Sequence, residues 1–469
     1  MDAGDEGNGI CFPYDVLLDI LRRLPGGAIA ACQCVCRSWR DIIHGHKLSL
    51  ECYFPRRAFP GFFVNKTGCR SDCTFFAPSS RRRLYYPRKT EVIHSCNGLL
   101  LMEDWGGYCV LNPATARYAL LPRLMPWSID LMSIAFDPAV SLHYHVFLLQ
   151  KDILVEQSLS VRPMGEEDPT PKRMPEELKK KSVPLLVYSS CTGRWEHRAF
   201  MPGRCARGHL YDVVAMKPAD YQGAFWSSEY WRGSLYVHCH NDVLMILRPS
   251  KGTYDMVPLP CGNCGPKDLY SLPQNSLLAS YERGIHFTVI DHLQLRVWLL
   301  AESADGQLGW TLAHDASLYP HGHMIHPLTI QPRVRWWTVG SKCGPVSVTE
   351  DDDDDSEEEK EDLDGSECSW NSDEENFIDV DRDDAHLGPP AWGLYGRLVG
   401  FHPHKNAVIL LIYFAVVVYH LDTSRMQYLG DENDLTRDHQ QQACCVDDMF
   451  AYRPCYEDVL PVGKPSLSS

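Results

Sequence analysis

The sequence predicts an α+β multidomain chain, in which a small N-terminal helical domain is followed by a large, mainly β domain. Two short segments before residue 46 have the apolar spacing of helices. After residue 92 a hairpin-like pattern recurs four times, and a further strand-like run precedes each copy. Tandem four-stranded units are typical of a β-propeller, and their spacing predicts six or seven blades.

The first helical segment lies between two prolines. Pro13 fits the first turn of a helix, where its missing N–H would have no partner, and Pro25 followed by two glycines ends the helix. Apolar residues recur between them at i, i+3, i+4 and i+7, which places them on one face of a helix. They are Leu17, Ile20, Leu21 and Leu24.

A second helical segment is expected from Ile29 to Gly45, after a break at Gly26 and Gly27. Its apolar stripe consists of Cys32, Val35, Cys36, Trp39, Ile42 and Ile43. The two cysteines of this stripe are interpreted as core residues. Two such helices bury little surface by themselves, since domains below about 40 residues usually need a metal, disulfides or a partner. The pair therefore needs a neighbour.

Three sequence motifs occur together in this region. They are Phe12-Pro13-x-Asp15, Leu17-Leu18-x-Ile20-Leu21-x-x-Leu24-Pro25 and Val35-Cys36-Arg37-x-Trp39-Arg40. In combination they resemble an F-box. The sequence departs from that pattern at Phe12, where Leu is usual, and at Gly26-Gly27-Ala28-Ile29, which replaces the usual polar helix start.

The resemblance implies that the segment docks onto the Skp-family adaptor of a cullin-RING ubiquitin ligase, with apolar residues inserted between the C-terminal helices of the adaptor. The residues expected to contact the adaptor, or to support those contacts directly, are Pro13, Leu17, Leu18, Ile20, Leu21, Leu24, Val35 and Trp39. The competing interpretation is an amphipathic helical hairpin that packs on its own domain.

The formal charge of the 469 residues is −16, and most of it comes from one segment. Between Glu350 and Asp384 there are 20 acidic residues and two basic ones, so the rest of the chain carries a net charge of +2. Blocks of like charge repel one another, and Asp351 to Glu361 is therefore expected to be a disordered loop. Basic runs such as Arg81-Arg82-Arg83 are too short to predict a nucleic-acid surface.

The 19 cysteines are an odd number, and the first ten residues have neither the basic start nor the apolar run of a secretory signal. We therefore expect an intracellular protein, cytoplasmic or nuclear, whose thiols are reduced. The longest apolar run, Ala407 to Tyr419, is shorter than the roughly 20 residues that span a bilayer. It is interpreted as buried strands, and no membrane partner is expected.

The recurring pattern has two apolar residues, a polar turn, Thr or Lys, a small residue, Arg or Thr, and a large apolar residue. Its copies are Val110-Leu111 with Thr115-Ala116-Arg117-Tyr118, Val187-Tyr188 with Thr192-Gly193-Arg194-Trp195, Ile246-Leu247 with Lys251-Gly252-Thr253-Tyr254, and Val418-Tyr419 with Thr423-Ser424-Arg425-Met426. Each copy is interpreted as a β-hairpin.

A fifth, divergent unit is expected at 286–312 and another around Val334 to Val339. An open pair of β-sandwich sheets is the structural alternative to a propeller. The order of an F-box-like segment and these hairpins is similar to that of plant F-box proteins with a propeller-like associated domain. The expected domains are a tail at 1–10, the F-box at 11–46, a linker with a possible first strand at 47–91, β domain at 92–345, an acidic disordered loop at 346–388, β domain at 389–462 and a tail at 463–469.

No catalytic, cofactor or metal site is predicted. The sequence has no Gly-x-Ser-x-Gly, no phosphate-binding Gly-x-x-x-x-Gly-Lys-Ser/Thr and no His-Glu-x-x-His. Cys261-x-x-Cys264 has the spacing of half a zinc site, but the candidate partners His238, Cys239 and His240 alternate along a strand. The two cysteines are therefore interpreted as loop thiols.

The sequence thus predicts a non-catalytic substrate receptor of an SCF-type ubiquitin ligase. One end is expected to bind the Skp-family adaptor, and through it a cullin, while the β domain binds an unknown target protein. The alternative from another class is a propeller enzyme or a carbohydrate-binding or small-ligand-binding protein with an N-terminal helical cap. A scaffold that binds the adaptor without joining a cullin is a third possibility.

Overall fold

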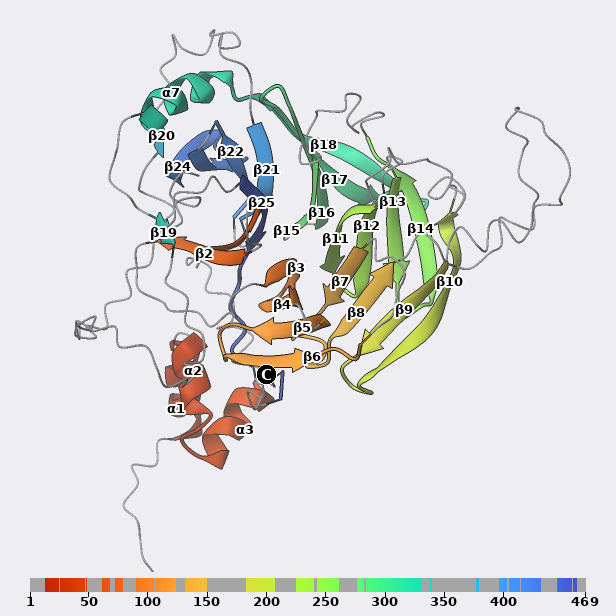
Figure 1. Cartoon of the computed structure of the whole chain (residues 1–469). Coiled ribbons are helices and arrows are strands. Elements are labelled where there is room, and N and C mark those ends of the chain that lie inside the picture. The colour runs from red at the N-terminus through yellow and green to blue at the C-terminus, as the bar shows by residue number, and fades with distance from the viewer. Residues whose placement is uncertain are drawn as a thin grey trace, which may run out of the picture.

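The computed structural model consists of three short helices followed by antiparallel sheets arranged like a propeller (Figure 1). The structure describes residues 13–24, 26–46, 48, 61–67, 72–78, 90–104, 107–123, 131–149, 183–206, 225–239, 243–260, 276–281, 284–330, 337–339, 377–378, 396–402, 405–413, 415–431, 445–457 and 459–461. The order of a helical segment and a mostly β domain is as the sequence predicted.

The N-terminal segment has three helices where the sequence predicted two. They are α1 (Tyr14–Arg22), α2 (Gly26–Cys32) and α3 (Arg37–Gly45). The expected second helix is interrupted because the backbone tightens into i→i−3 hydrogen bonds, as from Val35 N–H to Cys32 O at 3.2 Å. Cys36 is then extended, with φ −160°, and starts α3. The glycine pair expected to be a break lies inside α2.

Successive antiparallel units of four strands form most of the β domain. The first is β3 (Glu91–Cys96), β4 (Leu99–Asp104), β5 (Gly107–Asn112) and β6 (Arg117–Leu120). The second is β7 (Leu131–Ala135), β8 (His145–Leu149), β9 (Val183–Ser189) and β10 (Arg194–Ala206). The third is β11 (Phe225–Trp231), β12 (Ser234–Cys239), β13 (Val243–Arg248) and β14 (Thr253–Pro258). Parallel pairing of β10 with β14 joins the second and third units into one sheet.

Two further sheets follow along the chain. One is β15 (Ser276–Tyr281), β16 (Gly284–Asp291), β17 (Gln294–Glu302) and β18 (Leu308–Ser317), and it is followed by helix α7 (Tyr319–Ile330). The other is β21 (Gly396–Phe401), β22 (Ala407–Ile412), β23 (Ala415–His420) and β24 (Arg425–Asp431), with β20 (Phe377–Ile378) paired to the edge of β24. The predicted fifth unit at 286–312 is thus a meander of antiparallel strands.

The last sheet joins strands from both ends of the chain. Its order is β19 (Trp337–Val339), β2 (Asp72–Pro78), β1 (Phe62–Thr67) and β25 (Cys445–Ala451). The expected linker therefore contributes two strands, and the segment around Val334 to Val339 is an added edge strand of this sheet instead of a unit of its own. Phe62 pairs with Ala451 and Phe63 with Phe450, so the N-terminal and C-terminal strands close the arrangement together.

Contacts between the first strands of the units run in a closed circuit. The strand β3 contacts β7, β7 contacts β11, β11 contacts β15, β15 contacts β21, β21 contacts β25, and β25 contacts β3. The same strands surround the centre in Figure 1. Hydrophobic clusters fill the spaces between neighbouring sheets, as where Phe63 and Phe75 pack with Leu100 and Leu111.

All four copies of the recurring pattern are β-hairpins, as predicted. They join β5 to β6, β9 to β10, β13 to β14 and β23 to β24. The small residue of the pattern has a positive φ in every copy: 53° at Ala116, 66° at Gly193, 60° at Gly252 and 54° at Ser424. A left-handed residue brings a Cβ close to the following carbonyl, which explains why this position is small.

The predicted buried strands at Ala407 to Tyr419 are β22 and β23, and every described side chain in them is buried. Within the described residues, no helix has the length and apolar character to cross a membrane. The acidic stretch Asp351 to Glu361 and the Cys261-x-x-Cys264 pair lie outside the described residues. The strand β20 lies inside the range that was expected to be an acidic loop.

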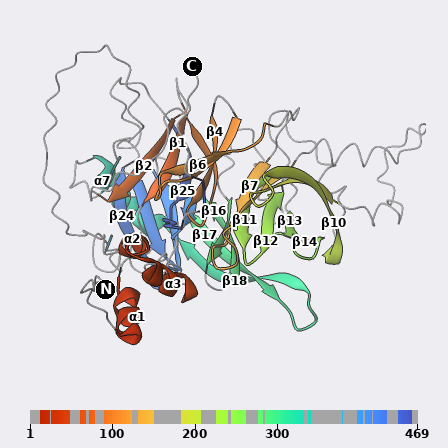
Figure 2. The same cartoon turned by 90° about the horizontal axis from the view of Figure 1, so that it is seen from below.

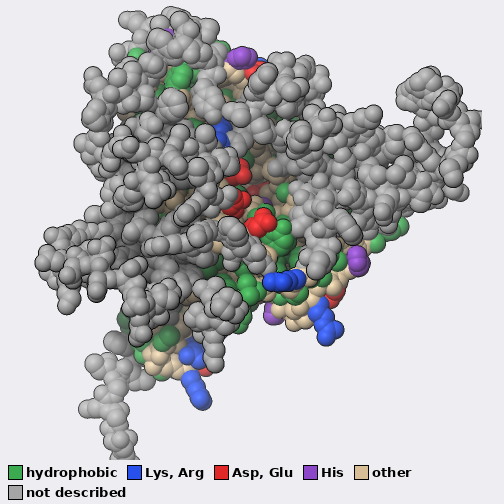
Figure 3. All heavy atoms as spheres, viewed as in Figure 1, with side chains coloured by type: hydrophobic (Ala, Val, Ile, Leu, Met, Phe, Trp, Pro, Cys, Tyr) green, Lys and Arg blue, Asp and Glu red, His purple; other side chains and the backbone are tan. Residues whose placement is uncertain are grey.

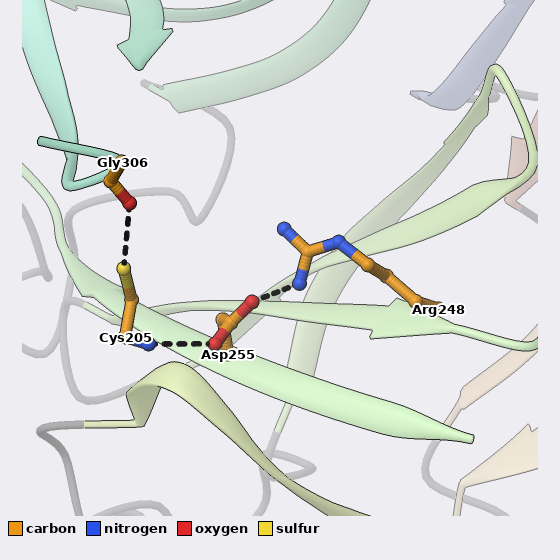
Figure 4. Close-up of polar contacts among 4 residues, drawn as sticks. All are labelled: Cys205, Arg248, Asp255 and Gly306. Atoms are coloured by element: carbon orange, nitrogen blue, oxygen red, sulfur yellow. Dashed lines mark hydrogen bonds and ion pairs between the residues drawn. The ribbon is translucent and has the colours of Figure 1, made fainter. Parts of the chain in front are cut away.

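A buried aspartate holds the junction of β10 and β14 (Figure 4). Asp255 is 4% exposed, accepts a hydrogen bond from the Cys205 N–H at 2.8 Å and forms an ion pair with Arg248. A Cβ at Gly203 would collide with its carboxylate, so glycine is required where β10 approaches β14. This carboxylate therefore links two units that have separate hydrophobic cores.

We predict that Asp255→Ala lowers the free energy of unfolding by about 3 kcal/mol, because it leaves the Arg248 charge and the Cys205 N–H without their acceptor. Urea denaturation monitored by tryptophan fluorescence measures the change. The matched variant Asp305→Ala, at an exposed turn position, is expected to unfold at the same urea concentration as the parent. Equal midpoints for both variants would contradict the role given to Asp255.

The hairpin turns provide a second prediction. Gly193→Ala should lower the free energy of unfolding by about 1 kcal/mol, because a Cβ at φ 66° is strained even though no neighbouring atom lies within 4 Å of it. Gly309→Ala adds a methyl group in equally open space on β18 without a positive φ. It should leave thermal stability unchanged or slightly raised, so similar losses in both variants would count against the backbone explanation.

Candidate functional site

The helical segment has a small hydrophobic core made only of its own described residues. The buried members are Leu17, Leu18, Leu21, Ile29, Ile42, Ile43 and Leu48, with Leu24, Cys32 and Trp39 packed against them. No described side chain of the β domain belongs to this cluster. Figures 1 and 2 show α1 clear of the strands. The segment thus covers its core without the β domain.

The eight residues predicted to contact or support an adaptor divide into three groups. Leu17, Leu18 and Leu21 are in the core of the helical segment, and Leu21 is fully buried. Leu24 and Trp39 are partly buried against that core. Pro13, Ile20 and Val35 are exposed, with Ile20 40% and Val35 62% accessible. The first two groups can support a binding surface, and only the last is free to form one.

The structure adds two exposed residues that the sequence reasoning missed. Tyr14 is 54% exposed and Val16 is 46% exposed. Pro13, Val16 and Ile20 follow one another at spacings of three and four residues, so they share one side of α1. We call these three residues the exposed ridge. Val16 was missed because its spacing fits a helix equally well, and only the structure shows which apolar side is covered.

Polar contacts hold the three helices in place around the exposed ridge. The Tyr14 hydroxyl lies 2.6 Å from His46 Nε2, which joins the start of α1 to the end of α3. Arg40 Nε donates to the Gln33 carbonyl at 3.1 Å, and His44 Nε2 lies 3.1 Å from Gln33 Oε1. These contacts fix the turn between α2 and α3, which carries Val35.

The two cysteines of the second stripe have different surroundings. Cys32 is partly buried against the helical core, as predicted, and burial raises the pKa of its thiol. Cys36 is exposed, so its interpretation as a core residue was wrong. The reason is the break between α2 and α3, which rotates Cys36 out of the helical register on which that interpretation depended.

The inner strands of the β domain were searched for a second site. His94 Nε2 donates to the Ser228 carbonyl at 3.0 Å, the hydroxyls of Ser133 and Ser228 are hydrogen-bonded, and Ser280 Oγ donates to Glu229 at 2.6 Å. Burial raises the pKa of Glu229 to about 7, against the opposing effects of Ser280 and Arg453. These contacts connect β3, β7, β11 and β15 to one another and are accounted for as links between units.

Metal ligation was tested on the same residues. Among the described part of the chain, no three His, Cys, Asp or Glu side chains are grouped so that they could hold a metal ion. His238 and Cys239, the described candidates for completing a zinc site, are both buried in β12. The helical segment therefore remains the site at which the described surface departs most from an ordinary solvated face.

Comparison with known proteins identifies the helical segment. Residues 10–50 match the F-box domain family. The F-box protein At3g07870 of Arabidopsis thaliana is 29% identical over 140 residues, which cover 26% of this chain and 33% of that protein. The putative F-box protein At5g52610 of the same plant is 24% identical over 161 residues, 30% of this chain and 42% of that protein. The chain thus aligns with less than half the length of either relative.

Among solved structures, the WD40 repeats of RRP9 are similar to the chain with a TM-score of 0.33 and 10% identity, over 76% of this chain and 84% of that one. A likeness this distant carries no argument. The N-terminal segment is an F-box domain, and the relatives named above are plant F-box proteins, as the sequence predicted.

The division between core and surface residues leads to a prediction about folding. Leu21→Ala should destabilise the F-box domain by about 2 to 5 kcal/mol, because it leaves a cavity at a fully buried position. Ile20→Ala, one residue away and 40% exposed, should change its stability by less than about 1 kcal/mol. Limited proteolysis of residues 13–48 in the full chain distinguishes the two. Equal protease resistance of both variants would contradict the assignment of the core.

Proposed function

We propose that this protein is a substrate-receptor subunit of an SCF-type cullin-RING ubiquitin ligase. Its F-box binds a Skp-family adaptor, and through it a cullin, and its β domain binds a target protein. The observation that carries the proposal is an F-box domain whose core is complete in itself and whose exposed ridge remains uncovered by any described residue of the chain.

The exposed ridge has the chemistry of a docking surface. Pro13, Val16 and Ile20 present apolar side chains to water beside charged residues, and Figure 3 shows green apolar side chains next to blue Lys and Arg side chains on this domain. Fully burying one such aliphatic side chain contributes about 1.5 to 3 kcal/mol. Several half-exposed side chains on a rigid, independently packed helix therefore favour binding of an apolar partner surface.

The role that we propose in ubiquitin transfer is positioning, without catalysis. A receptor that holds a target lysine near the charged conjugating enzyme raises the effective concentration of that lysine. The β domain suits this role because the inner strands hold one another through direct hydrogen bonds. A rigid ring keeps the bound target at a constant distance from the F-box.

We further propose that the β domain is a propeller of six blades, closed by the sheet that contains β1 and β25. The circuit of contacts among β3, β7, β11, β15, β21 and β25 supports this number, as does the four-stranded order of the units. An intracellular location, in the cytoplasm or the nucleus, is supported by the free thiols of the buried residues Cys73, Cys96, Cys109, Cys239 and Cys455.

The alternative, a propeller enzyme or ligand-binding protein with a helical cap, is less well supported. A cap would share its hydrophobic core with the domain that it covers, whereas the cluster formed by the three helices contains no described residue of the β domain. A scaffold that binds the adaptor without a cullin uses the same F-box surface. Ubiquitination of a bound target by the reconstituted complex separates a scaffold from a ligase receptor.

Adaptor binding tests the proposal. Ile20→Asp and Val35→Asp should each weaken binding of a purified Skp-family adaptor at least tenfold, because docking would bury an unpaired carboxylate. Isothermal titration calorimetry with the full chain measures the affinity. The control is Val140→Asp, at a 79% exposed apolar residue of the β7–β8 connection, which should bind as tightly as the parent. If both F-box variants keep the affinity of the parent, the proposed docking surface is wrong.

A further inference from the structure

The outer edges of the sheets differ in how they are covered. Within the described residues, β2 is covered by β19, β24 by β20, and β14 by the second half of β10. The outer strand β6 has only four residues. The strand β18 has ten residues and pairs with β17 alone. Because an uncovered edge presents unpaired N–H and C=O groups, β18 offers the longest such row in the described chain.

The remaining open edge, the first half of β10, is protected by charge. Arg194, Glu196 and Arg198 alternate along it, and charged side chains on an edge discourage pairing with another strand. The sequence of β18, LGWTLAHDAS, contains a single charged residue, Asp315. Its carboxylate is already engaged by Gln294 at 2.5 Å and by Arg296 at 3.6 Å, both on β17. The edge of β18 therefore lacks the usual charged protection.

The strand β18 is held firmly by its neighbours. Trp310 Nε1 donates to the Pro258 carbonyl at 2.9 Å, and His314 Nε2 lies 3.2 Å from the Tyr419 hydroxyl. Figure 4 shows Cys205 beside the β17–β18 turn, with its thiol 3.6 Å from the Gly306 carbonyl. Figure 2 shows this hairpin at the outside of the ring. The strand is thus anchored to two neighbouring sheets while its edge remains available.

We propose that the edge of β18 is the target-docking site, and that it takes an extended peptide segment as an added strand. The proposal rests on the receptor function proposed above. Leu308, Trp310 and Leu312 lie on one face of β18, and Leu312 is 51% exposed. A docked segment extends this apolar row with its own alternate residues, so the expected target segment alternates apolar and polar side chains.

An extended target segment fits this edge better than two other occupants. Pairing with β18 of a second copy would bury roughly 400 Å² per partner along about 33 Å of strand, against about 800 Å² per partner in a stable complex. The acidic segment of the same chain, between Glu350 and Asp384, is rich in Asp and Glu, which are depleted in strands. A short peptide segment needs only the hydrogen-bonding edge and the apolar row.

Peptide binding tests the proposal with the full chain. The probe is a library of fluorescein-labelled ten-residue peptides in which apolar and polar residues alternate. We expect library members to bind with dissociation constants in the micromolar range, as measured by fluorescence anisotropy, and Leu312→Lys to weaken binding at least tenfold. The matched control is Leu120→Lys, at a 72% exposed position on the short edge strand β6, which should leave binding unchanged. Amide hydrogen exchange in β18 should slow when peptide is bound.

The opposing outcomes are equally defined. Absence of binding by the library, or equal binding by Leu312→Lys, overturns the proposal. So does a concentration-dependent dimer abolished by Leu312→Lys, which would identify a second copy as the occupant. Peptide binding that occurs only after deletion of residues 350–384 would identify the acidic segment instead. Adaptor affinity is measured on the same samples, so failure of peptide binding with normal adaptor binding rejects only the docking edge.

Discussion

Pairing between β1 and β25 is the interaction on which the rest of the structure depends. It joins strands from the two ends of the chain, with Phe62 opposite Ala451, and so closes the circuit of inner strands. Phe63, Phe75 and Tyr452 pack beside it with ring centroids 4.8 to 6.0 Å apart. Closing so long a loop is entropically costly, and this buried aromatic contact offsets part of that cost.

The closing sheet is also attached to its neighbour by polar groups. The Asn65 side chain on β1 donates to the Val92 carbonyl and accepts from the Val92 N–H, at 2.7 and 3.0 Å. Beyond β25 the chain continues to Cys455, whose carbonyl accepts from Asn112 at 2.8 Å. A Cβ at Gly98 would collide with Cys455, so this close approach requires glycine. The F-box precedes β1 in the chain and is therefore attached to the most firmly tied sheet of the ring.

A receptor must leave some surfaces incomplete, and this chain does so in two places. The F-box completes its own core and still exposes Val16 and Ile20, whereas β18 completes its pairing with β17 and still exposes its outer edge. The chemistry of the two surfaces differs. An apolar helix side selects a partner by shape and burial, and a strand edge selects an extended backbone. The same chain can thus bind two unlike partners without competition between them.

Local chemistry in the sequence determined the F-box motifs, the apolar periodicity of α1 and the four hairpins. Each depends on residues near in the chain, such as the small residue that a positive φ requires at Gly193 and Gly252. The break before α3, the exposed side of α1, the added strands β19 and β20 and the open edge of β18 were decided only by tertiary structure. Periodicity identifies an apolar face but not what covers it, and strand pairing across hundreds of residues leaves no local pattern.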